Sequence, residues 1–314
     1  MKVLITGGAG FIGSHLCDAL IADRYHVIVV DNLSLGTRDN IAHLLGHKRF
    51  GFYNVDVSNY DEMSQIFQKE RFNAVFHLAA NSDIAKSREN PDIDFDNTLK
   101  TTYAVLKLMK DFEVKKLVFS SSSAIYGETD TNTKVKENFG PLFPVSHYGA
   151  GKLASEAFIS SFVENYDLKA WIIRFPNVVG ERATHGVIFD FINKLRKDPR
   201  ELEVLGNGEQ CKPYLYVRDL VEAILFIWNS SHDRINFFNV GVDSRTKVKD
   251  IAAIVTEEMK LTAAIRYTGG DRGWIGDVPA FDYDLSKINS LGWHAKISSD
   301  EAVRRSIQHI LGKK

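Results

Sequence analysis

Short hydrophobic runs with little polar alternation recur along the first half of the chain, separated by stretches in which hydrophobic residues return every three or four positions. The runs occupy residues 3–5, 27–30, 50–55, 73–77, 114–120 and 170–174. Such runs are typical of parallel strands that helices cover on both faces. The pattern therefore predicts an α/β fold with a doubly wound parallel sheet, followed by a smaller C-terminal α/β lobe.

Three glycines, Gly7, Gly10 and Gly13, separate the first predicted strand from a helix that we expect to begin at about Phe11. Glycine permits the tight turn, and the missing Cβ lets a pyrophosphate approach the backbone. The unpaired N–H groups and the positive dipole end of the helix would point at that phosphate. A strand, this loop and a helix together predict a Rossmann dinucleotide-binding unit rather than an ordinary turn.

Two acidic residues follow the next strands of this unit. Asp31 ends the second run, where a carboxylate would bind the adenosine ribose and repel a 2′-phosphate. Its neighbours supply no cation, so the sequence predicts NAD rather than NADP. Asp56 follows the third run, and we expect its side chain either at the adenine edge or as the cap of a helix that begins near Tyr60.

Two later segments carry groups that could do chemistry. The serines of 120–123 follow the fifth predicted strand, at the sheet edge where ligands bind, and one hydroxyl is expected to face a substrate. Ser146 is expected to cap a helix reaching about Tyr166, with Tyr148 and Lys152 on one face. A phenol is a poor base at neutral pH unless a nearby positive charge lowers its pKa. We interpret Tyr148 and Lys152 as a catalytic pair.

Composition narrows the class of protein. The chain has 314 residues, a net charge of −1 and two cysteines. A net charge this close to zero gives no general positive field that would attract nucleic acid or an anionic membrane. Cys17, Cys211 and His77 have no metal-ligand spacing, and His77 is expected to be structural. No signal peptide or membrane span is recognisable. We therefore expect a cytoplasmic protein without a metal site.

Several motifs together resemble one family. The stretch TGGAGFIGSH, the segments 31–33, 77–80 and 121–127, and Tyr148-Gly-Ala-Gly-Lys152 are similar to the extended short-chain dehydrogenases/reductases, in their nucleotide-sugar epimerase and dehydratase branch. The resemblance covers essentially the whole chain and implies NAD as cofactor, a UDP-sugar as substrate and a homodimer. It places cofactor contacts on Gly7, Gly10, Phe11, Ile12, Gly13, Asp31, Asn32, Asp56, Val57, Leu78, Ala79, Ala80, Asn97, Tyr148 and Lys152.

The same resemblance implies an isomerase that inverts C4 of a UDP-hexose. Tyr148 would take the proton of the C4 hydroxyl with the help of Ser122, while Lys152 holds Tyr148 and the nicotinamide ribose. The hydride would pass to NAD and return to the other face of a 4-keto sugar. Dehydratases of the branch carry an Asp-Glu pair after the catalytic hydroxyl; Ser123 and Ala124 stand there instead, which disfavours dehydration.

The second half resembles the sugar-nucleotide lobe of this branch. We expect residues 1–175 with 214–241 to bind NAD, and 176–213 with 242–314 to bind the nucleotide sugar. Lys212 stands where the family has an arginine that binds the diphosphate. A lysine offers that diphosphate a point charge instead of the planar, bidentate guanidinium of arginine. The usual arginine of the last substrate loop lies nearer Trp274 than Arg272. The implied substrate contacts are Ser122, Ser123, Asn177, Val187, Leu205, Lys212, Tyr214, Arg272 and Asp277.

The sugar and the assembly stay open at this point. Enzymes of the branch that act on UDP-glucuronate carry an extra arginine near the position of Thr184, so a neutral sugar of the glucose or N-acetylglucosamine series is favoured. A UDP-glucuronate 4-epimerase, a nucleotide-sugar 4-reductase, a dehydratase and a non-enzymatic NAD-binding regulator are the alternatives. The resemblance implies that helices at 95–112 and 147–166 form the dimer. The side chains at this contact could equally belong to the domain core. They are Val105, Leu108, Met109, Phe158 and Phe162.

Overall fold

The computed structural model describes residues 1–129, 134–270, 273, 278 and 280–313. Contacts divide the chain into two compact units. The first contains Met1–Ile125, Ser146–Arg174 and Ile224–Phe238, and the second contains Tyr126–Val145, Phe175–Ala223 and Asn239–Lys314. These boundaries differ from the expected domain limits chiefly at 126–145 and 214–223, and the assignment of a ligand to each domain stays a prediction.

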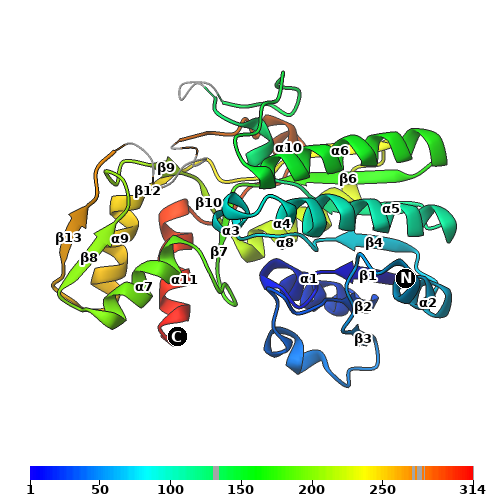
Figure 1. Cartoon of the computed structure of the whole chain (residues 1–314), viewed down its shortest axis with the longest axis horizontal. Coiled ribbons are helices and arrows are strands. Elements are labelled where there is room, and N and C mark those ends of the chain that lie inside the picture. Colours follow the sequence, from blue (N-terminus) through cyan, green and yellow to red (C-terminus); the bar gives the residue numbers. More distant parts are fainter. Residues whose placement is uncertain (130–133, 271–272, 274–277, 279, 314) are drawn as a thin grey trace. The chain divides into compact units, whose positions relative to one another are not determined.

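A seven-stranded sheet forms the centre of the first unit, in the order β11-β6-β5-β4-β1-β2-β3 (Figure 1). The strands are β1 (Lys2–Thr6), β2 (His26–Val30), β3 (Phe50–Tyr53), β4 (Ala74–His77), β5 (Lys116–Ser120), β6 (Lys169–Arg174) and β11 (Ile235–Asn239). All pairings from β6 across to β3 are parallel. The strand order reverses at β1, which is where open α/β sheets bind ligands. The predicted doubly wound fold is confirmed.

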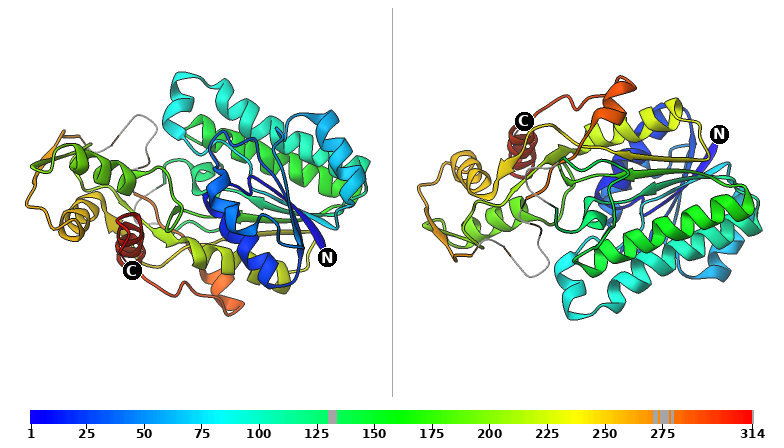
Figure 2. Two further views of the ribbon diagram at one scale, coloured as in Figure 1. Left: turned by 90° about the horizontal axis from the view of Figure 1, so that it is seen from below. Right: turned by 90° about the horizontal axis from the view of Figure 1, so that it is seen from above.

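Helices cover both faces of this sheet (Figure 2). One face packs its hydrophobic core against α2 (Tyr60–Glu70), α5 (Thr101–Asp111) and α6 (His147–Tyr166). On the other face lie α1 (Phe11–Ala22) and the C-terminal part of α8 (Val217–Ser230), whose Trp228 contacts the rings of Phe76 and Trp171. Strands buried on both sides explain the hydrophobic runs of the sequence.

The structure corrects the expected helix at 95–112. That segment contains the π-helix η2 (Phe95–Lys100) followed by α5, and the short helices α3 (Ile84–Glu89) and α4 (Asp92–Asp94) precede it. Val105, Leu108 and Met109 are fully buried in the core of the first unit. Their interpretation as dimer contacts is therefore wrong, and the alternative that they belong to the domain core is confirmed.

The second unit is built from short strand pairs and helices. β7 (Asn177–Val179) pairs with β10 (Tyr214–Tyr216), β8 (Glu201–Val204) with β13 (Ala264–Tyr267), and β9 (Cys211–Lys212) with β12 (Thr246–Lys247). Its core lies among α7 (Val187–Lys197), α9 (Val248–Glu258) and α11 (Ser299–Ile310). The short helix α10 (Ser286–Ser290) precedes α11 in the chain.

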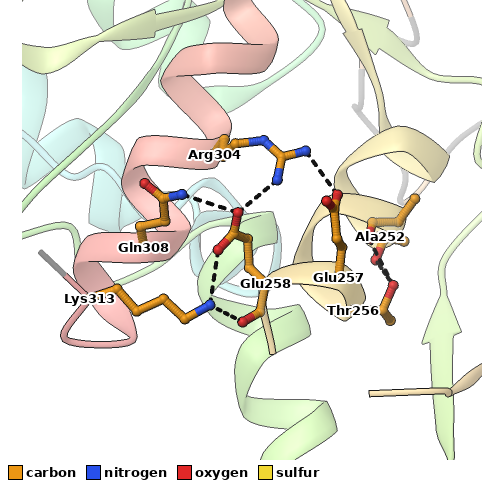
Figure 3. Close-up of polar contacts among 8 residues, drawn as sticks. Ala252, Thr256, Glu257, Glu258, Arg304, Gln308 and Lys313 are labelled. Carbon is orange, nitrogen blue, oxygen red and sulfur yellow. Dashed lines mark hydrogen bonds and ion pairs between the residues drawn. The ribbon is translucent and has the colours of Figure 1, made fainter. Parts of the chain in front are cut away.

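Polar contacts join the last helix to α9. Glu258, at the end of α9, accepts hydrogen bonds from Arg304 and Gln308 of α11 and from Lys313 (Figure 3). These donors, the Lys313 ammonium foremost, lower the pKa of Glu258 to about 2. Of the helices described, none has both the length and the hydropathy needed to cross a membrane.

Candidate active site

The loop between β1 and α1 has room for backbone alone. Gly7 has φ +71°, and a Cβ there would lie 2.7 Å from the Ala79 nitrogen. A Cβ on Gly13 would lie 2.2 Å from the Gly7 oxygen. The helix begins at Phe11, as predicted. Its N-cap residue is Gly10, which makes no side-chain hydrogen bond to the first turn. The first N–H groups of α1 are thus open to an anion such as a pyrophosphate.

Asp31 lies buried at the end of β2, beside this loop. Its carboxylate accepts hydrogen bonds from the Ala9 nitrogen at 2.9 Å and the Leu33 nitrogen at 2.8 Å. Burial raises the pKa of Asp31, although these two hydrogen bonds act to lower it. The carboxylate is therefore fixed in orientation at the edge where an adenosine ribose is expected.

The second acidic residue, Asp56, lies next to Asn32. Burial acts to raise the pKa of Asp56, but hydrogen bonds from Ser58 and Asn32 bring it below its ordinary value. The Asn32 amide donates to Asp56 at 2.9 Å. The side chain of Asn59, not that of Asp56, caps α2, so the capping alternative for Asp56 is wrong.

The segment after β4 lies against the glycine loop. The nitrogens of Leu78 and Ala79 donate to Thr6, at 3.1 Å to its carbonyl and 3.3 Å to its hydroxyl respectively. His77 is fully buried between the hydroxyls of Thr6, at 2.6 Å, and Thr102, at 3.0 Å. Its structural role is confirmed, because both ring nitrogens have protein partners.

The remaining expected cofactor contacts differ in where the structure places them. Ile12 lies in the first turn of α1 and Ala80 follows β4, whereas the side chain of Val57 is buried in the core. Asn97 is exposed, and its amide donates to the Ile93 oxygen at 2.9 Å. Its neighbour Thr98 is the buried residue of this turn. No described hydrogen bond joins Asn97 to the other expected cofactor contacts, and its role stays a prediction.

Ser122, Tyr148 and Lys152 come together where β5 ends and α6 begins. Ser146 caps α6 by accepting from the Gly149 nitrogen at 3.1 Å, as predicted. A hydrogen bond joins the side chains of Ser122 and Tyr148. The Lys152 ammonium donates to the Ser120 oxygen at 2.6 Å and lies 5.9 Å from the centre of the Tyr148 ring. Ser123 follows directly in the short helix η3 (Ser123–Tyr126).

Burial dominates the electrostatics of this group. It raises the pKa of Tyr148 to about 12, an effect that the Ser122 hydrogen bond opposes and the Asp94 charge increases. It lowers the pKa of Lys152 to about 7, against the charges of Asp94 and Glu156. The lysine therefore titrates near neutrality, and the tyrosine needs its positive charge to act as a base.

A buried ion pair supports the same strand end. Glu156 binds Arg174 through two hydrogen bonds, at 3.0 and 2.6 Å, and also accepts one from the Ser121 hydroxyl at 2.5 Å. Both charged side chains are more than nine-tenths buried. The sequence does not predict this pair; it shows only that Glu156 lies four residues after Lys152, on the same helix face.

The expected substrate contacts beyond residue 175 belong to the second unit. Asn177 begins β7 and is exposed, Val187 begins α7, and Leu205 is exposed after β8. Lys212 is half-buried in β9, and Tyr214 is buried in β10. Arg272, Trp274 and Asp277 lie outside the described residues.

Two further findings concern polar residues of the chain. Asp219 lies in the first turn of α8 and accepts a hydrogen bond from the Lys296 nitrogen at 2.9 Å. Within the described part of the chain, no group of three His, Cys, Asp or Glu side chains could hold a metal ion.

Comparison with known sequences gives consistent matches. The model of the NAD dependent epimerase/dehydratase family matches residues 3–241. A putative UDP-glucose 4-epimerase of Methanocaldococcus jannaschii is 34% identical over 310 residues, which cover 97% of both chains.

Solved structures of similar proteins share the fold over nearly the whole chain. A UDP-galactose 4-epimerase is 36% identical with a TM-score of 0.88, and a UDP-glucose 4-epimerase of Thermotoga maritima, solved with UDP-glucose, is 32% identical with a TM-score of 0.89. A UDP-glucuronic acid 4-epimerase of Bacillus cereus, in complex with UDP-glucuronic acid and NAD, is 26% identical with a TM-score of 0.89. Each alignment covers 99% of both chains.

Proposed function

Because the chain belongs to the NAD dependent epimerase/dehydratase family, we propose that it inverts C4 of a UDP-hexose of the UDP-glucose/UDP-galactose or N-acetylated series. The observation that carries this proposal is that Ser122, Tyr148 and Lys152 meet at the same edge of the sheet as the glycine loop, because β1 and β5 run parallel. The catalysed reaction is an isomerisation, as in the UDP-sugar 4-epimerases to which the chain is similar.

The residues of the first unit fit NAD. The open N–H groups of α1 would bind its pyrophosphate, and the oriented carboxylate of Asp31 its adenosine ribose. The ammonium of Lys152 carries three N–H groups, of which one has an acceptor among the described contacts, so two remain for ribose hydroxyls. NAD supplies the hydride acceptor and donor that inversion of a carbon centre requires.

The chain's own residues would move the proton. Tyr148 would take the proton of the C4 hydroxyl, and Ser122, hydrogen-bonded to Tyr148, would hold both oxygens in line. With a pKa of about 12, Tyr148 keeps its own proton at neutral pH unless a positive charge approaches. Lys152, whose pKa is about 7, can supply that charge and withdraw it.

Residue chemistry near the site separates the alternatives. Dehydration needs an acid and a base after the catalytic hydroxyl, and Ser123 and Ala124 carry no carboxyl group. A carboxylated sugar calls for an additional cation, and the exposed Thr184 offers none. We therefore favour a neutral UDP-sugar, with 176–213 and 242–314 as its lobe. A reductase would share these groups but would release its dinucleotide in every turnover.

We also propose a homodimer that forms through α5 and α6. These helices lie side by side on the first unit (Figures 1 and 2). The exposed rings of Tyr103, Phe158 and Tyr166 surround the ring of Phe162, which is buried in the core, and we call these four residues the aromatic patch. Tyr103 is 45% exposed and Phe158 41%, which is unusual for large apolar rings in contact with each other.

A panel of sugars tests the proposed activity. The protein, purified without added cofactor, is incubated separately with UDP-galactose, UDP-N-acetylgalactosamine and UDP-galacturonate, and the products are separated by chromatography. We expect the C4 epimer of a neutral sugar to form without added NAD. Conversion of UDP-galacturonate alone would favour the glucuronate alternative, and a requirement for stoichiometric added cofactor would favour the reductase.

A further inference from the structure

The segment from Ser34 to Leu45 contacts the glycine loop but lies outside the motifs that the resemblance assigns to the cofactor. Its helix η1 (Arg38–Leu44) is capped by the hydroxyl of Thr37. A hydrogen bond between the His43 ring and the Asp18 carboxylate, at 2.6 Å, joins it to α1. The segment is therefore fixed at both the loop and the helix that the loop precedes.

Both polar groups of one loop residue, Ala9, are occupied by the protein. Its nitrogen donates to Asp31 at 2.9 Å. Its carbonyl oxygen accepts from the Thr37 nitrogen at 3.1 Å and from the side-chain amide of Asn40 at 3.0 Å. Asn40 is 92% buried, so water does not compete easily for this carbonyl. The peptide that leads into Gly10 is thus held from two sides.

Gly36 approaches the same peptide more closely than any side chain could. A Cβ at this position would lie 2.9 Å from the Ala9 carbonyl carbon and 3.0 Å from the Gly10 nitrogen. Both atoms belong to backbone, so the contact cannot be relieved by turning a side chain. A larger residue at 36 would have to displace the loop itself.

We propose that Gly36, Thr37 and Asn40 form a brace that holds the Ala9–Gly10 peptide and so sets the glycine loop in its binding geometry before NAD arrives. They are positioning residues, because they act through the loop. A loop that is already ordered loses less conformational entropy on binding, which strengthens affinity without any new contact. The proposal rests on NAD binding and not on the sugar chemistry, so the two can fail separately.

Substitution of Asn40 tests the brace. Asn40→Asp keeps the size of the side chain but places a carboxylate against the Ala9 carbonyl, and Asn40→Ala removes the donor alone. We expect both variants to bind NAD about tenfold more weakly or worse in titration calorimetry of cofactor-depleted protein. They should also retain less NAD through purification. Their kcat at saturating NAD should equal that of the wild type. Asn193→Asp, an exposed position on α7, is the matched control.

Substitution of Gly36 provides an independent arm. Gly36→Ala should weaken NAD binding similarly, whereas Gly140→Ala, where a Cβ meets no atom within 4 Å, should not. In the cofactor-depleted variants, the amides of the glycine loop should exchange with solvent faster than in the wild type. Unchanged NAD affinity in the Asn40 and Gly36 variants would overturn the proposal. So would loss of the whole fold, because the segment would then support the unit rather than the loop.

Discussion

At the level of single residues, the proposed proton transfer depends on the phenol of Tyr148. Tyr148→Phe removes the proton acceptor and keeps the ring, so we expect kcat to fall by about 10²–10⁴-fold while NAD and UDP-sugar still bind. Tyr166→Phe, at the far end of the same helix, is the matched control and should keep full activity. A Tyr148→Phe enzyme with wild-type kcat would remove the tyrosine from the mechanism and revive the non-enzymatic alternative.

The buried histidine gives a prediction about pH and stability. Burial, together with the charge of Lys152, lowers the pKa of His77 from 6.5 to about 3. Between these values the unfolded chain binds a proton at this position that the folded chain does not, so the free energy of unfolding falls as the pH falls. From pH 7 to 4.5 the loss due to His77 should be about 3 kcal/mol.

Urea unfolding at the two pH values measures this loss. His77→Gln, which cannot titrate, should lose about 3 kcal/mol less than the wild type over the same interval. His294→Gln, at an exposed position, should follow the wild type. Equal losses in the wild type and the His77 variant would show that His77 is not buried in its neutral form.

At the scale of the element, the Glu156–Arg174 pair joins α6 to the ends of β5 and β6. Arg174→Met or Glu156→Leu alone removes one partner of this buried ion pair and should destabilise the protein by about 3–5 kcal/mol. The double variant removes both charges and should recover most of that loss. Thermal and urea unfolding of the four proteins forms a double-mutant cycle. Additive effects would contradict the paired geometry.

Local signals made much of the fold and site readable from the sequence. The start of α1 at Phe11 and the cap at Ser146 depend on residues within one turn of the chain. The buried strands can be predicted because both of their faces are apolar, which gives continuous hydrophobic runs in the sequence. His77 could be assigned a structural role because no metal-ligand spacing surrounds it.

Contacts between distant segments could not be read in this way. Nothing near Asn40 in the sequence indicates that it reaches the Ala9 carbonyl, and nothing near Arg174 indicates Glu156 as its partner. The capping alternative for Asp56 is wrong because Asn59, three residues further along the chain, caps α2. The π-helix at Phe95–Lys100 changes the helical period, and Thr98 is the buried residue of that turn.

At the scale of the whole molecule, the aromatic patch predicts association of two chains. Phe158→Glu places a charge in the centre of the proposed contact and should convert a dimer into a monomer in light scattering. Phe143→Glu, at a side chain that is 73% exposed in the second unit, is the matched control and should leave the mass unchanged. A monomeric wild type, or a Phe158→Glu variant with the wild-type mass, would contradict the dimer.

The fate of the hydrogen on C4 shows whether the inversion passes through a bound hydride acceptor. The protein, purified without added NAD, is incubated with UDP-galactose deuterated at C4, and the product is analysed by mass spectrometry. Inversion through a bound hydride acceptor predicts UDP-glucose that keeps its deuterium, because the same hydrogen returns to the same carbon. Absence of an epimer for every UDP-sugar of the panel, or an epimer that has lost its label to water, would contradict the account.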